Sequence, residues 1–364
     1  MKKADLKVPF IDHSINWNLY KNNYFEIFEE SLSSGQFQGD STKLTHFENI
    51  ISIDTGRNHT VLVGSGTEAL YMSMRLINDN EKTEVVVPAL SFTATASAIA
   101  RTGKHIVFQD ANIDCSCKFD HRKNIDNLIN EKTNAIIVVN MYGYPASETV
   151  EESYKTIPVI TDNAQGFVGN NKNFNYYNGL FNCLSFDPLK NLPAFGSAGA
   201  ILCDNELFAD SLRKLRKNSP DTDIPSQNSQ VSSHISATLL YKYSEFFNEW
   251  YDKRQTIVKK YCNGIKSVNY NDNYSRLSAN IFPLFHEDRN ELKEYLSDKN
   301  IDTKIHYPYL LPELKQFGGM SDSEAKELYP YSYEASRTEL SLPIYPDMTD
   351  EQIDKVIYYV NDFL

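Results

Sequence analysis

The sequence contains neither an excess of basic residues nor a long apolar segment. Its 48 acidic residues outnumber the 36 basic ones, so the 364-residue chain carries a formal net charge of −12. A nucleic-acid-binding protein needs a basic surface, and this charge argues against that class. A membrane-spanning helix needs an apolar run of about 18 residues or more, and no run approaches that length. We therefore expect neither a nucleic acid nor a membrane among the partners.

Cysteine is scarce as well. An odd and scattered set of five predicts neither a disulfide framework nor a zinc site. The cysteines are Cys115, Cys117, Cys183, Cys203 and Cys262. The histidines show no metal-ligand spacing, so no metal site is predicted. No apolar segment follows the basic residues near the start, so we expect no signal peptide. Free thiols indicate a reducing compartment, and a cytoplasmic protein is expected.

Short apolar segments alternate with helix-like segments from about residue 60 to 205. Strands are predicted at 61–63, 84–87, 106–108, 135–139, 159–160, 184–186 and 200–202, with helices at 67–76 and 94–101. The apolar residues of these strands are continuous, which indicates a sheet covered on both faces. The alternation predicts a mostly parallel order, so the expected fold class is α/β.

The character of the chain changes after about residue 235. Large apolar residues recur at helical spacing between Leu239 and Tyr261, which predicts a long amphipathic helix. A strand is predicted over 279–285, a helix over 289–296, and a last helix after the capping box that begins at Thr349. We expect a large α/β domain over residues 1–235 and a smaller α+β domain over residues 236–364.

Lys190 is the first candidate for chemistry. It follows the strand predicted over 184–186 and stands between Pro188 and the glycine-rich turn at 196–199. Lysine amines form Schiff bases with aldehydes, including that of pyridoxal phosphate (PLP). Most of the 36 basic residues should be ordinary surface charges, so Lys190 is informative only if other segments fit the same cofactor.

Residues 64–68 join a predicted strand to a predicted helix. Ser65 and Glu68 form the pattern of a capping box, and the glycines on either side of Ser65 allow a close backbone approach. Free N–H groups at a helix N-terminus can bind a phosphate. A well-capped helix without a ligand explains the same residues, so both interpretations stay open.

Other polar and aromatic residues follow predicted strands, where ligands of open α/β sheets bind. Asp162 could keep the pyridine nitrogen of PLP protonated, or it could cap a helix. Gln165 could hydrogen-bond the ring hydroxyl, and Phe92 could stack on the ring or belong to the core. Asn228 lies in a polar loop, where it could be a turn residue. His306-Tyr307 could contact a sugar or phosphate of the substrate, or be structural.

Taken in order, these segments resemble the DegT/DnrJ/EryC1/StrS family of PLP-dependent sugar aminotransferases over nearly the whole chain. The family patterns are SG-x-F-x-G with FE, (S/N)GT-(D/A)-AL, P-x-x-(S/T)F-x-AT-x-x-A, YG, DAAQ, SF-x-P-x-KNL, T-x-x-HYP and LSLP. They match residues 34–39 with 47–48, 65–70, 88–98, 142–143, 162–165, 185–192, 303–308 and 340–343. Each match is weak alone, whereas the whole series in order is specific. The resemblance implies the type I aminotransferase fold.

The resemblance also implies a role for each candidate residue. Lys190 would hold PLP and shuttle protons, and Asp162 would pair with the pyridinium nitrogen. Gln165 would contact the ring hydroxyl, and Phe92 would stack on the ring. Asn228 would reach the phosphate of the neighbouring subunit's PLP, which implies a homodimer with shared active sites. The residues implied to hold the phosphate within one chain are Gly66, Thr67, Glu68 and Ser185.

Some positions depart from the family pattern. The usual GDGG is Gly196-Ser197-Ala198-Gly199, the arginine common two residues after the loop asparagine is Gln230, and Gly166-Phe167 replaces the usual HGA. An arginine clamps a phosphate in a bidentate manner, so its loss indicates that a nucleotide sugar is held in a different way. These departures concern the substrate more than the cofactor.

The resemblance implies that an amino acid, expected to be L-glutamate, donates its amine to a keto-deoxysugar carried on a nucleotide. The KNL form of the lysine motif favours amination at C3 over C4, for surface glycans or other amino sugars. A PLP- or PMP-dependent sugar dehydratase is an alternative, although such proteins usually have histidine in place of Lys190. A non-catalytic regulatory or scaffold protein is another, although Lys190 and Asp162 are both present.

Overall fold

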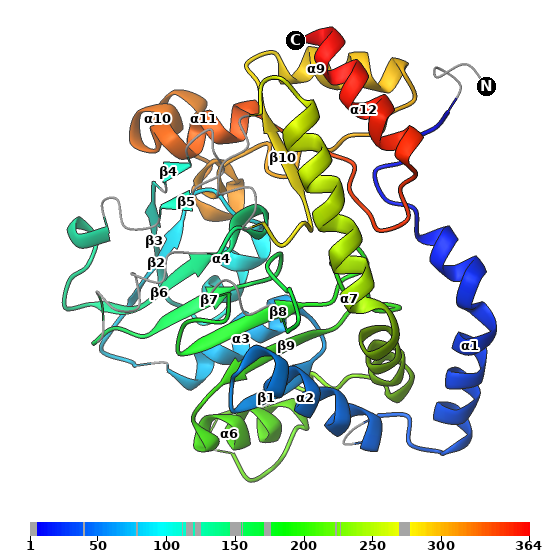
Figure 1. The fold of residues 1–364 in the computed structure, drawn as a ribbon. Coiled ribbons are helices and arrows are strands. Elements are labelled where there is room, and N and C mark those ends of the chain that lie inside the picture. The colour runs from blue at the N-terminus through cyan, green and yellow to red at the C-terminus, as the bar shows by residue number, and fades with distance from the viewer. Residues whose placement is uncertain are drawn as a thin grey trace.

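A seven-stranded mixed sheet forms the centre of the protein, seen here in a computed structural model (Figure 1). The structure describes residues 6–38, 41–77, 79–110, 112–113, 119–120, 125–145, 154, 156–170, 176–222, 224–225, 227–268 and 277–364. The sheet strands are β1 His59–Val63, β2 Glu84–Pro88, β3 His105–Gln109, β6 Thr133–Val139, β7 Val159–Asp162, β8 Phe181–Ser185 and β9 Gly199–Cys203. Each predicted strand between residues 60 and 205 is thereby confirmed, with ends that differ by a few residues.

The strand order is β1-β9-β8-β7-β6-β2-β3. β9 pairs antiparallel with both β1 and β8, whereas the other neighbouring pairs are parallel, which confirms the predicted mostly parallel α/β sheet. The carboxyl ends of the parallel strands therefore meet at one edge. β9 begins at that same edge, because Gly199 pairs with Val63 on one side and with Ser185 on the other.

Helices cover both faces of the sheet. They are α2 Thr42–Thr55, α3 Gly66–Leu76, α4 Thr93–Ala100, α6 Glu206–Arg216 and α7 Ser233–Gly264. Successive residues of a strand point to opposite faces. Val61 and Val63 of β1 accordingly share a core with α3, α4 and α6, whereas Leu62 shares another with α2 and α7. The helices predicted at 67–76 and 94–101 correspond to α3 and α4.

The C-terminal part contains a two-stranded antiparallel sheet of β10 Phe282–Phe285 and β11 Glu339–Leu342. Its helices are α9 Arg289–Asp298, α10 Asp322–Leu328, α11 Pro330–Thr338 and α12 Asp350–Phe363. The capping box predicted at Thr349 is confirmed at the start of α12. The strand predicted over 279–285 began too early, because Ala279 has a left-handed φ of 59° that no strand accommodates.

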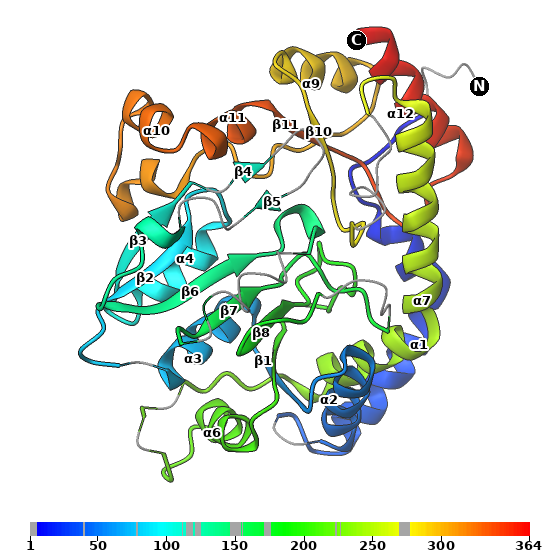
Figure 2. The same cartoon turned by 60° about the vertical axis from the view of Figure 1, so that its left-hand side comes forward.

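Helix α7 joins the two parts of the structure. Its residues Leu239 to Phe247 pack in the core with α2, and its residues Ile257 to Cys262 pack in the core with α12 (Figure 1). The helix α1, His13–Ser33, lies alongside α7 (Figure 1 and Figure 2). Because α7 runs through the predicted boundary between residues 235 and 236, the division into two domains stays a prediction.

Several short elements complete the fold. They are β4 Asn112–Ile113, β5 Phe119–Asp120, and the 3-10 helices η2 Ile125–Asn127, η3 Met141–Gly143, η4 Leu311–Glu313 and η5 Lys315–Phe317. Across the described ranges, no helix is both long and apolar enough to cross a membrane. Cys183, Cys203 and Cys262 are free and buried, and Cys115 and Cys117 lie outside the described residues.

A buried ion pair ties α2, β1 and α6 together. The Oε1 atom of Glu48 lies 2.6 Å from Nη1 of Arg216 and accepts a 2.7 Å hydrogen bond from the Leu62 amide. The same Arg216 nitrogen donates to the Leu62 carbonyl at 2.9 Å. Burial raises the pKa of the Glu48 carboxyl, and the charge of Arg216 opposes that rise. Arg216 thus offsets part of the cost of burying the Glu48 carboxylate.

We predict that Arg216→Met lowers the free energy of unfolding by about 3–5 kcal/mol, because it leaves the Glu48 carboxylate buried without its cation. Urea denaturation followed by circular dichroism measures the loss. Arg213→Met is the matched control in the same helix, since Arg213 pairs with Asp210 at the surface, and it should cost less than about 1 kcal/mol. Equal losses in the two variants would contradict the prediction.

Candidate active site

A cavity of about 400 Å³ opens at the edge where the parallel strands end. Predicted site residues from distant parts of the chain border it together. They are Gly66, Thr67, Phe92, Asp162, Gln165, Ser185, Lys190, His306 and Tyr307. Asp162 and Ser185 are the last residues of β7 and β8, and His306 and Tyr307 lie between α9 and η4. The others lie in turns or helix starts that follow strands of the large sheet. The geometry is that of a crevice beyond the carboxyl ends of an open α/β sheet.

The turn between β1 and α3 leaves no room for side chains larger than glycine. A Cβ atom on Gly66 would lie 2.9 Å from Cβ of Ser185, and one on Gly199 would lie 2.4 Å from the carbonyl carbon of Ser65. The N-terminus of α3 therefore packs directly on the start of β9 and the end of β8. Amide groups of Gly66 and Thr67 at this N-terminus suit an anion such as a phosphate.

Glu68 does not border the cavity. Its backbone N–H donates to Oγ of Ser65 at 3.1 Å, which makes Ser65 the N-cap of α3. Its carboxylate pairs with Arg101 at 2.6 Å instead of turning back to the N-cap. The predicted capping box is thus only half formed, because the arginine competes for the carboxylate. The phosphate contact expected of Glu68 stays a prediction.

Asp162 ends β7 with a buried carboxylate that has defined donors. Its Oδ2 accepts from Oγ1 of Thr95 at 2.7 Å, and its Oδ1 accepts from the amide of Ala164 at 3.2 Å. Burial raises the pKa of Asp162, and the two hydrogen bonds together with the charge of Lys190 oppose the rise. Thr95 was not predicted as a site residue, although it lies within the segment at 88–98 that matches the family pattern.

Lys190 lies in a tight turn after β8. Its amide donates to the Asp187 carbonyl at 2.9 Å, and the Leu189 amide donates to the Asp187 carboxylate at 3.0 Å. Burial lowers the pKa of the Lys190 amine, and Asp162 and Asp187 oppose that fall, whereas Lys304 adds to it. A lowered pKa increases the fraction of neutral amine, which is the nucleophilic and proton-accepting form.

Gln165 holds Tyr307 in place at the cavity wall. Its Oε1 accepts from the Tyr142 amide at 2.7 Å, and its Nε2 donates to the Tyr307 hydroxyl at 2.5 Å. The hydroxyl accepts from Gln165, so its own hydrogen is oriented to donate elsewhere. The contact of Gln165 with a ring hydroxyl stays a prediction.

Phe92 and Asn228 are both exposed, but only Phe92 borders the cavity. Phe92 is 60% exposed although it borders the cavity, so its ring offers an open face for a planar group. Asn228 does not border this cavity and has a left-handed φ of 48°. Its neighbour Ser229 accepts a 2.9 Å hydrogen bond from the amide of Gly64, which fixes the loop against the turn after β1.

Lys190 also borders a second cavity of about 400 Å³. Aromatic residues of α1, α7 and the turn after Lys190 form part of its wall, and four charged side chains besides Lys190 line it. These residues are Trp17, Phe195, Trp250, Asp12, Lys242, Arg254 and Asp347. Lys190 therefore lies between two spaces of similar size.

The sequence profile of the DegT/DnrJ/EryC1/StrS aminotransferase family matches residues 19–361. The chain belongs to this family. Its members are PLP-dependent, so the protein is a PLP-dependent aminotransferase with the type I aminotransferase fold. The sequence-based assignments of family, fold and cofactor are confirmed.

Individual relatives are also similar to this chain over nearly its whole length. The pleiotropic regulatory protein of Geobacillus stearothermophilus is 26% identical, over 98% of this chain and 99% of its own length. The dTDP-3-amino-3,4,6-trideoxy-alpha-D-glucose transaminase of Streptomyces venezuelae is 25% identical, over 98% and 96%. A family aminotransferase structure from Brucella abortus has a TM-score of 0.88 and 24% identity, over 98% and 99%. The structure of NtdA from Bacillus subtilis with bound PMP has a TM-score of 0.81 and 25% identity, over 97% and 84%.

The residues present fit PLP. The turn at Gly66 has space only for backbone, which suits the phosphate, and the exposed ring of Phe92 suits the pyridine ring. The buried carboxylate of Asp162 suits a protonated ring nitrogen, since a positive partner would offset its burial. Lys190 borders the same cavity and would supply the amine.

We predict that Thr95→Val weakens PLP binding tenfold or more, because a hydrogen bond to a charged group contributes about 1.5–3 kcal/mol. Loss of this donor also raises the pKa of Asp162 further. PLP affinity should fall on acidification, because Asp162 becomes protonated. In Thr95→Val this fall should therefore occur at a higher pH than in the wild type. Fluorescence titration with PLP across pH measures both effects.

Thr102→Val is the matched control for this variant. Thr102 follows α4 and donates only to the Ile99 carbonyl. The same change of hydroxyl to methyl there should leave the affinity and its pH dependence as in the wild type. A Thr95→Val variant with wild-type PLP affinity would refute the role of Thr95.

Proposed function

We propose that the protein transfers an amino group from L-glutamate to the keto group of a nucleotide-linked deoxysugar, with C3 as the aminated carbon. The observation that carries this proposal is the position of Lys190 between two cavities. The cavity beside Asp162 fits the cofactor, and the cavity beside Trp17 and Phe195 has room for part of a large acceptor. One lysine would then serve both the donor and the acceptor.

PLP, when bound, carries the amino group between the two substrates and accepts the negative charge that develops on the reacting carbon. Asp162 holds the positive charge of the ring in a buried position. Lys190 Nζ binds the cofactor and takes and returns protons, for which its lowered pKa is suited. Phe92 orients the ring, and the turn at Gly66 with Ser185 holds the phosphate. Tyr307 and His306 face the substrate.

The second cavity supports a nucleotide as the carrier of the sugar. Aromatic walls suit a planar base, and buried cations suit phosphates. Lys242 is buried, donates to the Pro193 carbonyl at 2.9 Å, and lies 3.6 Å from the centre of the Phe195 ring. Burial lowers its pKa to about 7, so an anion would restore its charge. We propose that Lys242 and Arg254 replace the arginine absent at position 230.

The exposed Asn228 supports a homodimer with shared active sites. Its loop is fixed by Ser229 on the turn that would hold the phosphate, yet Asn228 stays outside the cavity of its own chain. We propose that it reaches the cofactor phosphate of a second copy. We also propose that the enzyme acts in the cytoplasm and supplies amino sugars for surface glycans or related products.

The first experiment records visible absorption of the purified protein with PLP, before and after addition of L-glutamate. We expect a band of lysine-bound PLP that is lost in Lys190→Ala and that converts to a pyridoxamine spectrum with glutamate. Lys242→Met is the matched control, because it changes the other lysine at the second cavity. It should keep the band and the glutamate response, but raise KM for the nucleotide sugar about tenfold.

Each other outcome favours a different function. A wild-type protein without the band would overturn the enzyme proposal and favour a non-catalytic role. A band that no amino acid changes would favour a sugar dehydratase. Conversion by an amino acid other than glutamate would correct the identity of the donor alone. A wild-type KM in Lys242→Met would contradict the proposal that the nucleotide binds in the second cavity.

Mixing two inactive variants tests the shared site. Lys190→Ala and Asn228→Ala homodimers should each have little activity, because each active site lacks one residue. In a mixed dimer one of the two sites is complete, so a re-equilibrated equal mixture should regain about a quarter of wild-type activity. Unmixed samples treated in the same way are the control. No recovery in a mixture with proven subunit exchange would contradict the sharing of Asn228.

A further inference from the structure

A chain of hydrogen bonds starts at Nδ1 of His306 and runs through Ser341 to Glu339. Nδ1 of His306 lies 2.7 Å from Oγ of Ser341, and this hydroxyl donates to Oε1 of Glu339. The other carboxylate oxygen, Oε2 of Glu339, accepts from the backbone amide of His306 at 3.2 Å. The three residues therefore form a closed loop between β11 and the segment that ends in His306-Tyr307.

The direction of these bonds follows from donor chemistry. An ionised carboxylate only accepts hydrogen bonds, so the single hydrogen of the Ser341 hydroxyl is used on Glu339. The hydroxyl oxygen can then only accept from His306, which places the ring hydrogen on Nδ1. The neutral ring has one hydrogen, so Nε2 carries a lone pair. In the described residues no hydrogen bond is made by Nε2, and His306 borders the cofactor cavity.

The electrostatic surroundings favour the same protonation states. Burial lowers the pKa of His306 to about 3, with help from the charges of Lys304 and Lys190, so the ring is neutral. Burial raises the pKa of Glu339 to about 7, against the hydrogen bonds from Ser341 and His306 and the charges of Arg289 and Lys304. Above that pH the carboxylate is ionised and acts as an acceptor.

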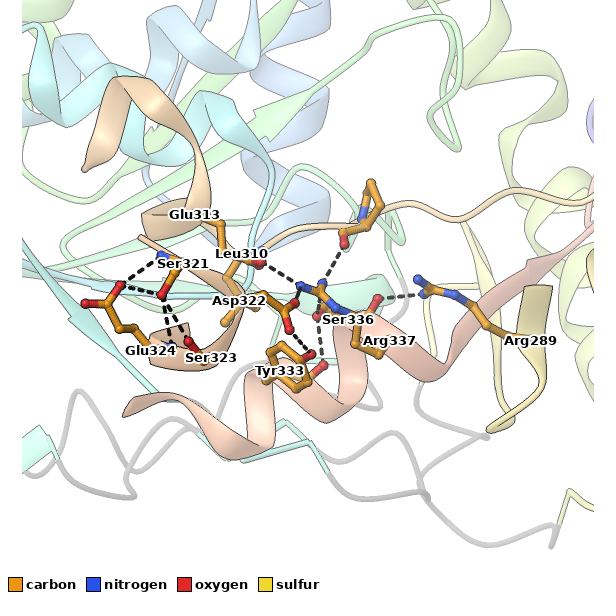
Figure 3. Close-up of polar contacts among 11 residues, drawn as sticks. Arg289, Leu310, Glu313, Ser321, Asp322, Ser323, Glu324, Tyr333, Ser336 and Arg337 are labelled. Carbon is orange, nitrogen blue, oxygen red and sulfur yellow. Dashed lines mark hydrogen bonds and ion pairs between the residues drawn. The ribbon is translucent and has the colours of Figure 1, made fainter. Parts of the chain in front are cut away.

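The neighbouring backbone holds both ends of the loop. The Lys304 and Ser341 amides and carbonyls exchange hydrogen bonds at 3.2 and 2.8 Å. Arg289 donates to the carbonyls of Ser336 and Glu339 at 2.6 and 3.1 Å. Figure 3 shows Arg289 beside Ser336 at one end of α11. The Glu339 side chain is thus presented from a fixed backbone.

The segment after His306 is fixed to the same helix. Arg337 donates to the Pro308 carbonyl at 2.7 Å and pairs with Glu313 at 2.6 Å and with Asp322 at 2.9 Å (Figure 3). Its guanidinium also lies over the ring of Tyr333. The start of β11 and the segment after His306 are therefore both held at α11. The Glu339 carboxylate and the His306 imidazole have little freedom to separate.

We infer that Glu339 is a positioning residue which, through Ser341, keeps His306 in the Nδ1–H form and so presents Nε2 as a hydrogen-bond acceptor in the active site. An acceptor at this point selects a substrate group that donates a hydrogen, such as a sugar hydroxyl, over a carboxylate or keto oxygen. The choice of substrate group rests on the proposed function, whereas the state of the ring does not.

Heteronuclear NMR of the histidine ring nitrogens tests the inference on the resting protein. The signal of His306 is assigned among the eight histidines by its loss in His306→Gln. Spectra at about pH 8.5, where a carboxyl with a pKa of about 7 is ionised, should show hydrogen on Nδ1 and none on Nε2. Hydrogen on Nε2 in the wild type would overturn the inference, whatever the activity of the enzyme.

Glu339→Gln should reverse the ring. If the amide oxygen keeps the His306 backbone N–H, the amide nitrogen must donate to Ser341, which then donates to Nδ1 and leaves the hydrogen on Nε2. Glu324→Gln is the matched control, because that carboxylate also accepts from a backbone amide and a serine hydroxyl, both of Ser321, at 3.0 and 2.6 Å. It should leave the ring unchanged. A Glu339→Gln protein that keeps hydrogen on Nδ1 would contradict the inference.

Two further measurements distinguish a positioning role of Glu339 from a purely structural one and from the proposed function. Ser341→Ala breaks the chain without reversing it, so the ring should become a mixture of both forms; this variant decides the case if Glu339→Gln does not fold. In a protein with confirmed activity, Glu339→Gln should raise KM for the acceptor sugar about tenfold and leave KM for the amino donor unchanged. An equal rise in both would indicate only a structural role. Absence of any transaminase activity in the wild type would count against the proposed function and leave the NMR result intact.

Discussion

The close packing of β9 on the turn after β1 is the constraint on which the active site depends. A side chain at Gly199 would bring its Cβ within 2.4 Å of the carbonyl carbon of Ser65. Gly199 also pairs with Ser185, and Gly66 packs against the Ser185 side chain. One set of backbone contacts therefore fixes both the N-terminus of α3 and the end of β8. The turn that carries Lys190 starts from that fixed end, so its position follows from the sheet.

The cavity brings together two buried groups of opposite charge, Asp162 and Lys190, and the pKa of each depends on the charge of the other. Burial raises the pKa of Asp162 and lowers that of Lys190, whereas their mutual attraction opposes both changes. A positively charged ring nitrogen beside Asp162 would take over the part of Lys190 in stabilising this carboxylate. Lys190 could then be neutral without leaving Asp162 unpaired. The arrangement thus suits a lysine that must alternate between binding a cofactor and moving protons.

The sequence predicts those features that depend on neighbouring residues. Continuous apolar runs identified the strands of the sheet. Short motifs placed Asp162 and Ser185 at strand ends and Lys190 in the turn after a strand, and the topology brings the three together. Features that depend on distant partners were not predictable. Thr95 meets Asp162 across 67 positions of sequence, and Arg101 takes the Glu68 carboxylate that a capping box would use. The helix α1 also escaped prediction, since large apolar residues on it remain exposed: Leu19, Phe25 and Leu32.

The altered turn at 196–199 shows how departures from the family pattern can be compatible with the cofactor site. Gly196 has a φ of 131°, which only glycine adopts without strain, and Gly199 has no space for a side chain. These two glycines are present in this chain. Ala198 replaces a glycine at a fully buried position where its methyl group fits, and Ser197 faces the cofactor cavity. The two positions with a backbone requirement thus keep the family residue, and the two without one have changed. The change at Ser197 removes a carboxylate from a cavity that already contains the carboxylate of Asp162, so it alters the charge that a bound molecule would meet there.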